Sequence, residues 1–345
     1  MIQTRLIAAA TALTALFLAG PAYAQFDSFG ANVAISLSPR YPQPGQSVHL
    51  TLNGSGVDLT SSSVVWQADG KIIAQGVGKD SADIVAGKLG SETAVEADVV
   101  GSDGQTYSTL VTVAPTQLDL LVGSDSYTPP FYRGRALPSP GTNLIVQALA
   151  HFKRADGSLI ADGDIVYTWK QDGQVLGTLS GRGKSSARIP IQHLFTGSTL
   201  TLDAASVDGT RSGETSVSVP QQSPALELYE DHPLYGILYN NALNTTVAVP
   251  ENEATFAAVP YFAQAASTDD PALSYVWSVN DARVPRATGS QSELTINADN
   301  STGMASISLE LTRAGNFYLD ALGKWNVSFS TSQTGGANPF TQPTP

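Results

Sequence analysis

The chain has 345 residues, a formal net charge of −12 at pH 7, 14% charged residues and no cysteine. The lack of cysteine excludes disulfides, thiol nucleophiles and cysteine-based zinc sites. An acidic chain of this kind is repelled by nucleic acid and by anionic membrane surfaces, so neither is an expected partner.

The N-terminus has the pattern of a secretory signal. Arg5 precedes an apolar run over residues 6–19, and Ala22-Tyr23-Ala24 gives the small residues that signal peptidase cuts after. The run is shorter than the roughly 20 apolar residues of a membrane-spanning helix. We therefore predict a signal peptide over residues 1–24 and a secreted or extracytoplasmic chain without membrane insertion; an uncleaved anchor is the alternative.

Three segments repeat around a tryptophan. Trp66, Trp169 and Trp277 lie 103 and 108 residues apart, each on an alternating apolar segment. A hairpin turn follows each one, because Gly, Asn and Asp accept the positive φ that tight turns need. The turn dipeptides are Asp69-Gly70, Asp172-Gly173 and Asn280-Asp281. The spacing matches the roughly 100 residues of one immunoglobulin-like sandwich.

The segments that flank each tryptophan repeat as well. A proline-led corner precedes each one, at Pro44-Gly45, Pro140-Gly141 and Pro250. Strands at intervals of about ten residues, with Gly and Asp turns, predict an all-β chain. We expect three tandem sandwiches over residues 25–115, 116–222 and 223–332, with the three tryptophans in their cores. Residues 333–345 are Gly, Asn, Pro, Thr and Gln in the main and predict a disordered tail.

This pattern resembles the immunoglobulin-like and PKD-like domains of bacterial surface proteins. The resemblance covers nearly the whole chain after the signal and depends on the tryptophan strand and the Pro-Gly corner. It implies a fold rather than an activity, because these sandwiches carry many unrelated functions. Unlike antibody domains, no segment has two cysteines beside the tryptophan, so each indole must pack on aliphatic side chains and find a main-chain partner.

A second motif, with Tyr, Pro, an apolar residue, Tyr and Gly, precedes two of the corners. We expect it at the junctions between sandwiches, where its aromatic rings would fill the space between neighbours. The alternative is an exposed platform that binds a glycan or a peptide. The residues concerned are Tyr127, Phe131, Tyr132, Tyr229, Tyr235 and Tyr239.

Several loops carry carboxylates that could bind calcium. Calcium needs six to eight oxygen ligands around one point, whereas each of these loops offers two or three acidic or amide groups. Ordinary hairpin turns explain them equally well, and we expect no cofactor, with Ca²⁺ as the alternative. The candidates are Asp156, Asp162, Asp164, Asp269, Asp270, Asp299 and Asn300.

The sequence contains no recognisable catalytic motif. Its histidines are His49, His151, His193 and His232, of which the first two fall on predicted strands. No Gly-x-Ser-x-Gly elbow, His-Glu-x-x-His helix or phosphate loop is present. We therefore expect a non-enzymatic structural or adhesive protein of a cell-surface or appendage-associated assembly, with other extracytoplasmic proteins or glycans as partners. A glycan- or peptide-binding module is the alternative and a hydrolase the remote one.

Overall fold

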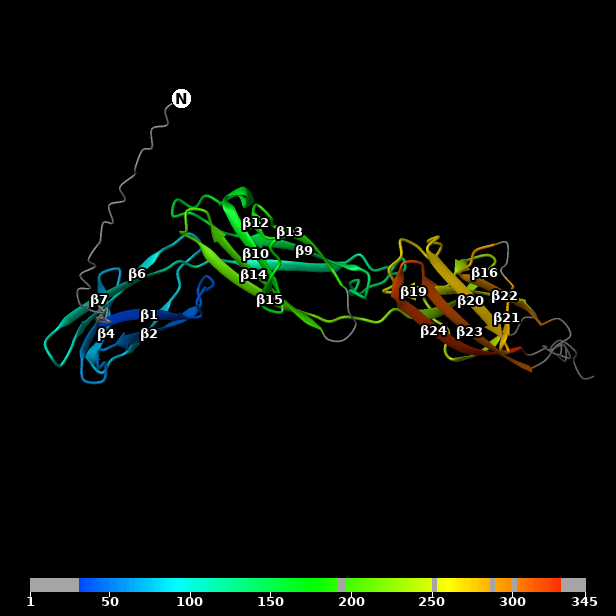
Figure 1. Ribbon diagram of the computed structural model, residues 1–345, viewed down its shortest axis with the longest axis horizontal. Coiled ribbons are helices and arrows are strands. Elements are labelled where there is room, and N and C mark those ends of the chain that lie inside the picture. The colour runs from blue at the N-terminus through cyan, green and yellow to red at the C-terminus, as the bar shows by residue number, and fades with distance from the viewer. Residues whose placement is uncertain (1–30, 192–196, 250–252, 286–288, 299–302, 330–345) are drawn as a thin grey trace, which may run out of the picture. The chain divides into compact units, whose positions relative to one another are not determined.

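The computed structural model describes residues 31–191, 197–249, 253–285, 289–298 and 303–329 (Figure 1). The predicted signal peptide, the predicted tail and the third corner at Pro250 lie outside these residues. No helix among the residues described is both long and apolar enough to cross a membrane.

By compactness, the chain separates into two units. One contains residues 31–36, 51–82 and 96–110, and the other contains 37–50, 83–95 and the described residues from 111 onward. These limits differ from the three predicted ranges 25–115, 116–222 and 223–332, which therefore stay a prediction. The strands themselves repeat three times, as follows.

The first set of strands makes two sheets. One sheet has the order β1-β2-β5 and the other the order β4-β3-β6-β7. The bounds are β1 (Asn32–Ser38), β2 (Ser47–Ser55), β3 (Ser63–Ala68), β4 (Lys71–Val77), β5 (Ser81–Val85), β6 (Thr93–Val100) and β7 (Thr106–Val113).

The second set makes a sheet of order β13-β9-β8 and another of order β11-β10-β14-β15, with β12 paired to β10. A single 3₁₀ turn, Asp162–Asp164, precedes β10. The bounds are β8 (Leu118–Ser124), β9 (Asn143–Ala150), β10 (Ile165–Gln171), β11 (Gln174–Val175), β12 (Gly181–Arg182), β13 (Ser186–Pro190), β14 (Ser198–Ser206) and β15 (Ser212–Val219).

The third set makes a sheet of order β17-β16-β19-β22 and another of order β18-β24-β23-β20-β21. Strand β18 runs parallel to β24, whereas the other registers of this set are antiparallel. The bounds are β16 (Ala225–His232), β17 (Gly236–Ile237), β18 (Thr246–Val249), β19 (Glu253–Tyr261), β20 (Leu273–Val279), β21 (Ala282–Arg283), β22 (Glu293–Asn297), β23 (Gly303–Arg313) and β24 (Asn316–Phe329).

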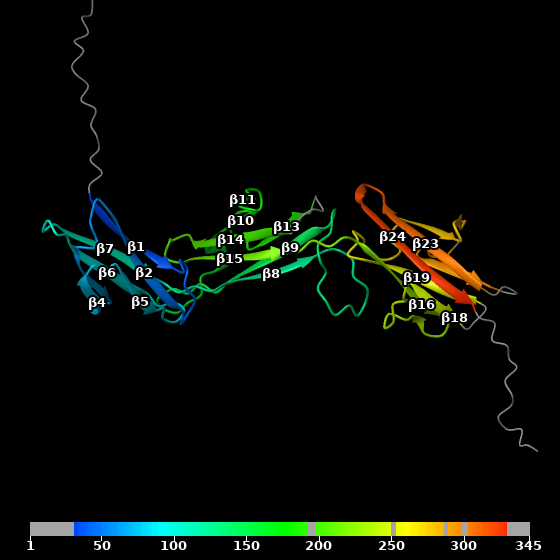
Figure 2. The same ribbon diagram turned by 90° about the horizontal axis from the view of Figure 1, so that it is seen from below.

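All three sets therefore share one strand order. The strands β12, β17 and β18 are additions to this pattern. Without them, the first, second and fifth strands of each set form one sheet, and the fourth, third, sixth and seventh form the other. This is the arrangement of immunoglobulin-like and fibronectin-like sandwiches. The prediction of an all-β chain of tandem immunoglobulin-like sandwiches is confirmed. We call the sets the first, second and third sandwich. In Figure 2 the two sheets of the second sandwich lie face to face, as do the two sheets of the third.

The predicted turns have the backbone that tight hairpins require. Asp69 and Gly70 have φ of 46° and 75°, and Asp172 and Gly173 have φ of 50° and 82°. In the third sandwich Asn280 and Asp281 replace the Asp-Gly pair and still adopt φ of 49° and 64°. Two central residues at positive φ match the right-handed twist of the flanking strands, so each turn fixes the register of the hairpin that starts at its tryptophan strand.

Alternation along the strands places apolar side chains between the sheets. Strand β14 alternates buried positions with half-buried or exposed ones over its whole length, and β9 buries Leu144, Val146 and Ala148. In the second sandwich these residues pack with Trp169 in one continuous apolar cluster. Burial of one face at a period of two is what holds each sheet in a single register.

Candidate functional site

The three repeated tryptophans lie in equivalent central strands. Trp66 and Trp169 have no exposed surface and Trp277 is 6% exposed. Each indole N–H donates a hydrogen bond to a main-chain carbonyl of its own sandwich, so the polar atom of the ring is satisfied. The acceptors are the carbonyls of Lys79, Lys184 and Gln291, at 2.9, 3.0 and 3.0 Å.

The carboxylates considered for calcium in the second sandwich have protein partners. Asp156 accepts a main-chain N–H bond two residues ahead, as a turn aspartate does. Asp162 accepts the hydroxyl of Tyr167 at 2.8 Å, and Asp164 pairs with Arg182 at 2.7 Å. These contacts explain the conformations of the loops without a metal ion.

In the third sandwich, Asp270 is 2.9 Å from Arg313 and accepts main-chain N–H bonds from Ala266 and Ala272 at 3.0 Å. Burial raises the pKa of Asp270, but these hydrogen bonds and the arginine outweigh it and hold the pKa below 3.8. Among the described residues, no group of three or more His, Asp or Glu side chains could hold a metal. Asp299 and Asn300 lie outside those residues, and the expectation of no cofactor, with Ca²⁺ as the alternative, stays untested.

The histidines form no catalytic arrangement in the part of the chain that is described. His49 lies 2.8 Å from Asp83, and both side chains are more than half exposed. His151 was expected on a strand, but β9 ends one residue earlier, and its ring is 3.6 Å from Asp119. No serine hydroxyl among these residues donates a hydrogen bond to either ring.

Tyr127 connects the second sandwich to the third through its main chain. Its N–H donates to the carbonyl of Ala263 at 2.8 Å, and its carbonyl accepts the N–H of Phe262 at 2.7 Å. The hydroxyl of Ser139 donates to the carbonyl of Phe262 at 2.5 Å. The long β8–β9 connection is thereby bonded at two places to the loop that follows β19.

The Pro-Gly corner of the second sandwich makes a further contact with the third. The amide nitrogen of Asn316, at the β23–β24 turn, donates to the carbonyl of Pro140 at 3.0 Å and to Gln264 at 2.9 Å. Gly141 has φ of 87°, and a Cβ there would lie 2.2 Å from that amide nitrogen. Only glycine fits this position, for both its backbone and its neighbour.

Aromatic rings fill the space around these bonds. Tyr132 meets Tyr261 and Phe262 edge to face, with ring centres 5.7 and 5.9 Å apart. The hydroxyls of Tyr229 and Tyr261 are 2.5 Å apart, and the rings of Tyr229 and Tyr239 are 5.5 Å apart. We call Tyr127, Tyr132, Tyr229, Tyr239, Tyr261 and Phe262 the tyrosine seam.

Three tyrosines of the seam, Tyr127, Tyr229 and Tyr239, have hydroxyl pKa values raised above the ordinary value for tyrosine. Burial raises the pKa of Tyr127 to about 12, and the charges of Tyr239, Tyr261 and Asp269 add to the effect. Burial and the hydrogen bond shared with Tyr261 also raise the pKa of Tyr229. Phenols whose pKa values are raised in this way are suited to packing and hydrogen bonding rather than to proton transfer near pH 7.

Two of the aromatic residues expected at the junctions lie elsewhere. Because β16 continues through Tyr229 to His232, the rest of its motif forms a hairpin tip, where Tyr235 is 76% exposed and lies on the His232 ring at 4.7 Å. Phe131 is 90% exposed and has a φ of 66°. The six predicted residues thus divide into four in the seam, of which Tyr132 is 37% exposed, and two outside it.

Arg211 is a buried cation that the sequence does not single out. Its side chain is 1% exposed and donates to the carbonyls of Lys153, Thr210 and Gly90 and to the carboxylate of Glu92. The last two acceptors lie in the loop between β5 and β6, so Arg211 bonds that loop to the second sandwich. A single arginine in a turn gives no sequence signal of such a role.

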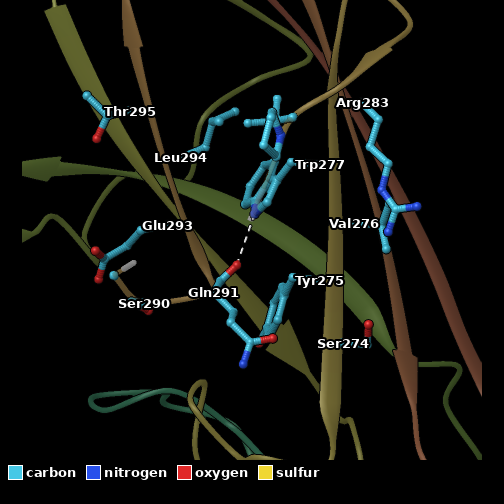
Figure 3. Close-up of a pocket in the computed structure, with 13 residues that line it drawn as sticks. Ser274, Tyr275, Val276, Trp277, Arg283, Ser290, Gln291, Glu293, Leu294 and Thr295 are labelled. Carbon is cyan, nitrogen blue, oxygen red and sulfur yellow. Dashed lines mark hydrogen bonds between the residues drawn. The ribbon is translucent and has the colours of Figure 1, made fainter. Parts of the chain in front are cut away.

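Two of the cavities that the described residues of the third sandwich form bear on its function. One, of about 620 Å³, has Tyr275, Trp277, Gln291, Glu293 and Arg283 in its wall, and Figure 3 shows the Trp277 indole bonded to the carbonyl of Gln291 there. Burial raises the pKa of Glu293, and the negative charges of Asp231 and Asp269 raise it further.

The second cavity has a volume of about 530 Å³ and lies between β16, β18 and β19. Leu243, Phe256 and neighbouring aliphatic residues form its apolar wall, whereas Glu230, Asp231 and Glu253 are its charged residues. No cation lines it among the described residues. We call it the acidic cavity.

Comparison with known proteins gives distant likeness only. No family model matches the chain, and no curated protein matches it. The three N-terminal domains of the bacteriophage RB49 outer capsid protein Hoc are 10% identical, cover 87% of this chain and 98% of their own, and give a TM-score of 0.26. Fibronectin(III)-like modules of Clostridium thermocellum CbhA are 15% identical, cover 55% and 95%, and also give 0.26.

SGBP-B of the Bacteroides ovatus mixed-linkage glucan utilization locus, solved in complex with a mixed-linkage heptasaccharide, is 13% identical. It covers 86% of this chain and 70% of its own length, with a TM-score of 0.22. Scores this low carry no argument about what this chain binds, so its function has to be argued from its own residues.

Proposed function

We propose that this chain is a non-enzymatic structural or adhesive protein that works outside the cytoplasm, as a component of a cell-surface or appendage-associated assembly. The observation that carries the proposal is the chemistry at the junction of the second and third sandwiches. Packed tyrosine rings, a glycine corner and four inter-sandwich hydrogen bonds are used there to join sandwiches. A protein that bears load or holds a fixed spacing needs such joints.

The proposal predicts a fixed spacing between these two sandwiches. Because the chain has no cysteine, Val175→Cys and Leu322→Cys can be spin-labelled specifically, and both positions are more than half exposed. Pulsed electron-spin distance measurements should give one narrow distribution. Tyr132→Ala with Ser139→Ala should broaden it, whereas Tyr235→Ala, outside the seam, should not. A broad distribution in the unmodified seam would contradict the proposal.

A glycan- or peptide-binding role is the second candidate, and the exposure of Phe131 and Tyr235 favours it. Glycan arrays and peptide panels should then give binding that Phe131→Ala or Tyr235→Ala removes. Trp-lined cavities such as the one in Figure 3 offer a further place for a sugar. Turnover in a hydrolase substrate panel would contradict both candidates.

A further inference from the structure

One exposed loop concentrates positive charge and aromatic surface. Residues 130–135 read Pro-Phe-Tyr-Arg-Gly-Arg, and all six are exposed. Phe131 is 90% exposed, and Arg133 and Arg135 form no ion pair among the described residues. In a chain of net charge −12 this is an unusual place to leave two unpaired arginines beside an exposed ring. We call it the basic loop.

The basic loop is held rather than free. Main-chain bonds from Tyr127 lie on one side of it, Pro138–Pro140 are buried on the other, and Tyr132 packs on Tyr261 within it. Phe131 adopts a φ of 66°, a conformation that a bulky side chain rarely takes. An exposed ring presented on an ordered loop loses little conformational entropy when it binds.

Tyr, Phe and Arg are the residues that dominate the energetics of protein–protein interfaces. A membrane is a weaker candidate, because two arginines alone are only weakly attracted to an anionic surface. That attraction is opposed by the large negative charge of the chain. The partner should therefore be a protein surface with an apolar recess and carboxylates around it.

The acidic cavity of the third sandwich has this chemistry. Glu230 and Asp231 have no ion-pair partner among the described residues, and Leu243 and Phe256 form an apolar wall beside them. Its volume of about 530 Å³ lies within the range of sites that bind a single large group. We propose that the basic loop of one copy of this chain binds the acidic cavity of a second copy, with Phe131 inside and the two arginines on Glu230 and Asp231.

This contact joins two different surfaces, so it is head-to-tail. Each copy keeps one free loop and one free cavity after the first contact, and the interaction can repeat along a chain of copies. The proposal rests on the structural role given above, but it does not depend on the tyrosine seam. Self-assembly would supply the adhesive function that a single chain of sandwiches lacks.

The test is sedimentation velocity of the full chain over a wide concentration range. Self-association should appear as concentration rises and weaken with added salt, because exposed charge pairs are screened. The loop variant Arg133→Glu/Arg135→Glu and the cavity variant Glu230→Arg/Asp231→Arg should each weaken it by at least about tenfold. Phe131→Ala should weaken it with both charges intact.

Charge reversal also allows a rescue. A mixture of the loop variant and the cavity variant should associate, because the reversed loop then faces the reversed cavity, although neither variant associates alone. Lys71→Glu/Lys88→Glu is the matched control, since it changes the charge equally at two exposed lysines and should leave association unchanged. Thermal unfolding should be the same for all variants.

A chain that stays monomeric at every concentration and salt level overturns the proposal. So does a mixture that fails to associate, or a loop variant that behaves like the lysine control. The spin-label distances across the seam are independent of these results, so failure of self-assembly and failure of the proposed function can be told apart.

Discussion

Each repeated tryptophan brings one polar atom, the indole nitrogen, into an apolar interior. A main-chain carbonyl of the same sandwich accepts the hydrogen bond from its N–H. We expect Trp66→Ala, Trp169→Ala and Trp277→Ala each to lower the free energy of unfolding of its own sandwich by about 3–5 kcal/mol, the cost of removing a large buried side chain. Urea unfolding followed by circular dichroism measures this. Ile72→Ala, at a position 60% exposed, is the control and should change stability little.

Asp270 predicts a dependence of stability on pH. Its folded pKa lies below its ordinary value, so its stabilising effect is complete above about pH 5 and is lost as pH falls through the depressed pKa. Asp270→Asn should cost about 2–4 kcal/mol at pH 7, because it removes the charge from Arg313 and weakens two N–H bonds.

The difference between Asp270→Asn and the unmodified protein should shrink as pH falls below the ordinary pKa of an aspartate, because the carboxyl of Asp270 is protonated first in the unfolded chain and, at lower pH, in the folded chain as well. Urea unfolding at pH 7, 4 and 3 measures the trend. A difference that is constant over this range would mean that the charge of Asp270 contributes nothing, and that only its shape matters.

Sequence reasoning succeeds at residues whose role is local. The indole of Trp169 and the turn at Asp172-Gly173 follow from strand alternation and turn chemistry within a few residues. Arg211 and Asn316 could not be found in this way, because their partners at Gly90 and Pro140 are distant in the chain. Tyr261-Phe262 offered a signal, as a second aromatic pair next to a proline, but nothing local shows what it packs against.

At the scale of elements, the two Pro-Gly corners form a natural pair of controls. Gly45 and Gly141 both have positive φ, but a Cβ on Gly45 meets nothing within 4 Å, whereas a Cβ on Gly141 meets Asn316. Gly45→Ala should cost about 1 kcal/mol from backbone strain alone. Gly141→Ala should cost about 2–4 kcal/mol, since it also displaces the amide bonded to Pro140. Equal losses in urea unfolding would mean that the corner contributes nothing beyond its own turn.

Arg211 predicts an asymmetry between the two members of one ion pair. Arg211→Ala leaves three main-chain carbonyls without their donor in a buried place and should cost about 3 kcal/mol or more. Glu92 is 45% exposed, so Glu92→Gln should cost less than about 1 kcal/mol. Thermal unfolding of both variants measures the asymmetry. A large loss for Glu92→Gln would show that charge, and not the bonds to carbonyls, holds this loop.

At the scale of the whole molecule, the repeat itself was predictable and its joints were not. The period of about 105 residues, the turns and the strand alternation follow from the sequence, and the three matching strand orders agree with them. The two aromatic motifs look alike in sequence and both contribute tyrosines to the seam, yet only the second continues into an exposed hairpin tip. Local pattern specifies a sandwich, whereas the contact between sandwiches depends on which surfaces the fold leaves free.

The equivalent burial of Trp66, Trp169 and Trp277 has a practical consequence. Indole emission shifts to longer wavelength when the ring becomes hydrated, so each sandwich contains a built-in fluorophore at the same depth. Trp325 lies in the core cluster of Trp277 and shares its sandwich. A variant in which every tryptophan outside one chosen sandwich is replaced by phenylalanine would emit from that sandwich alone. Its unfolding under heat, denaturant or pulling force could then be followed within the intact chain.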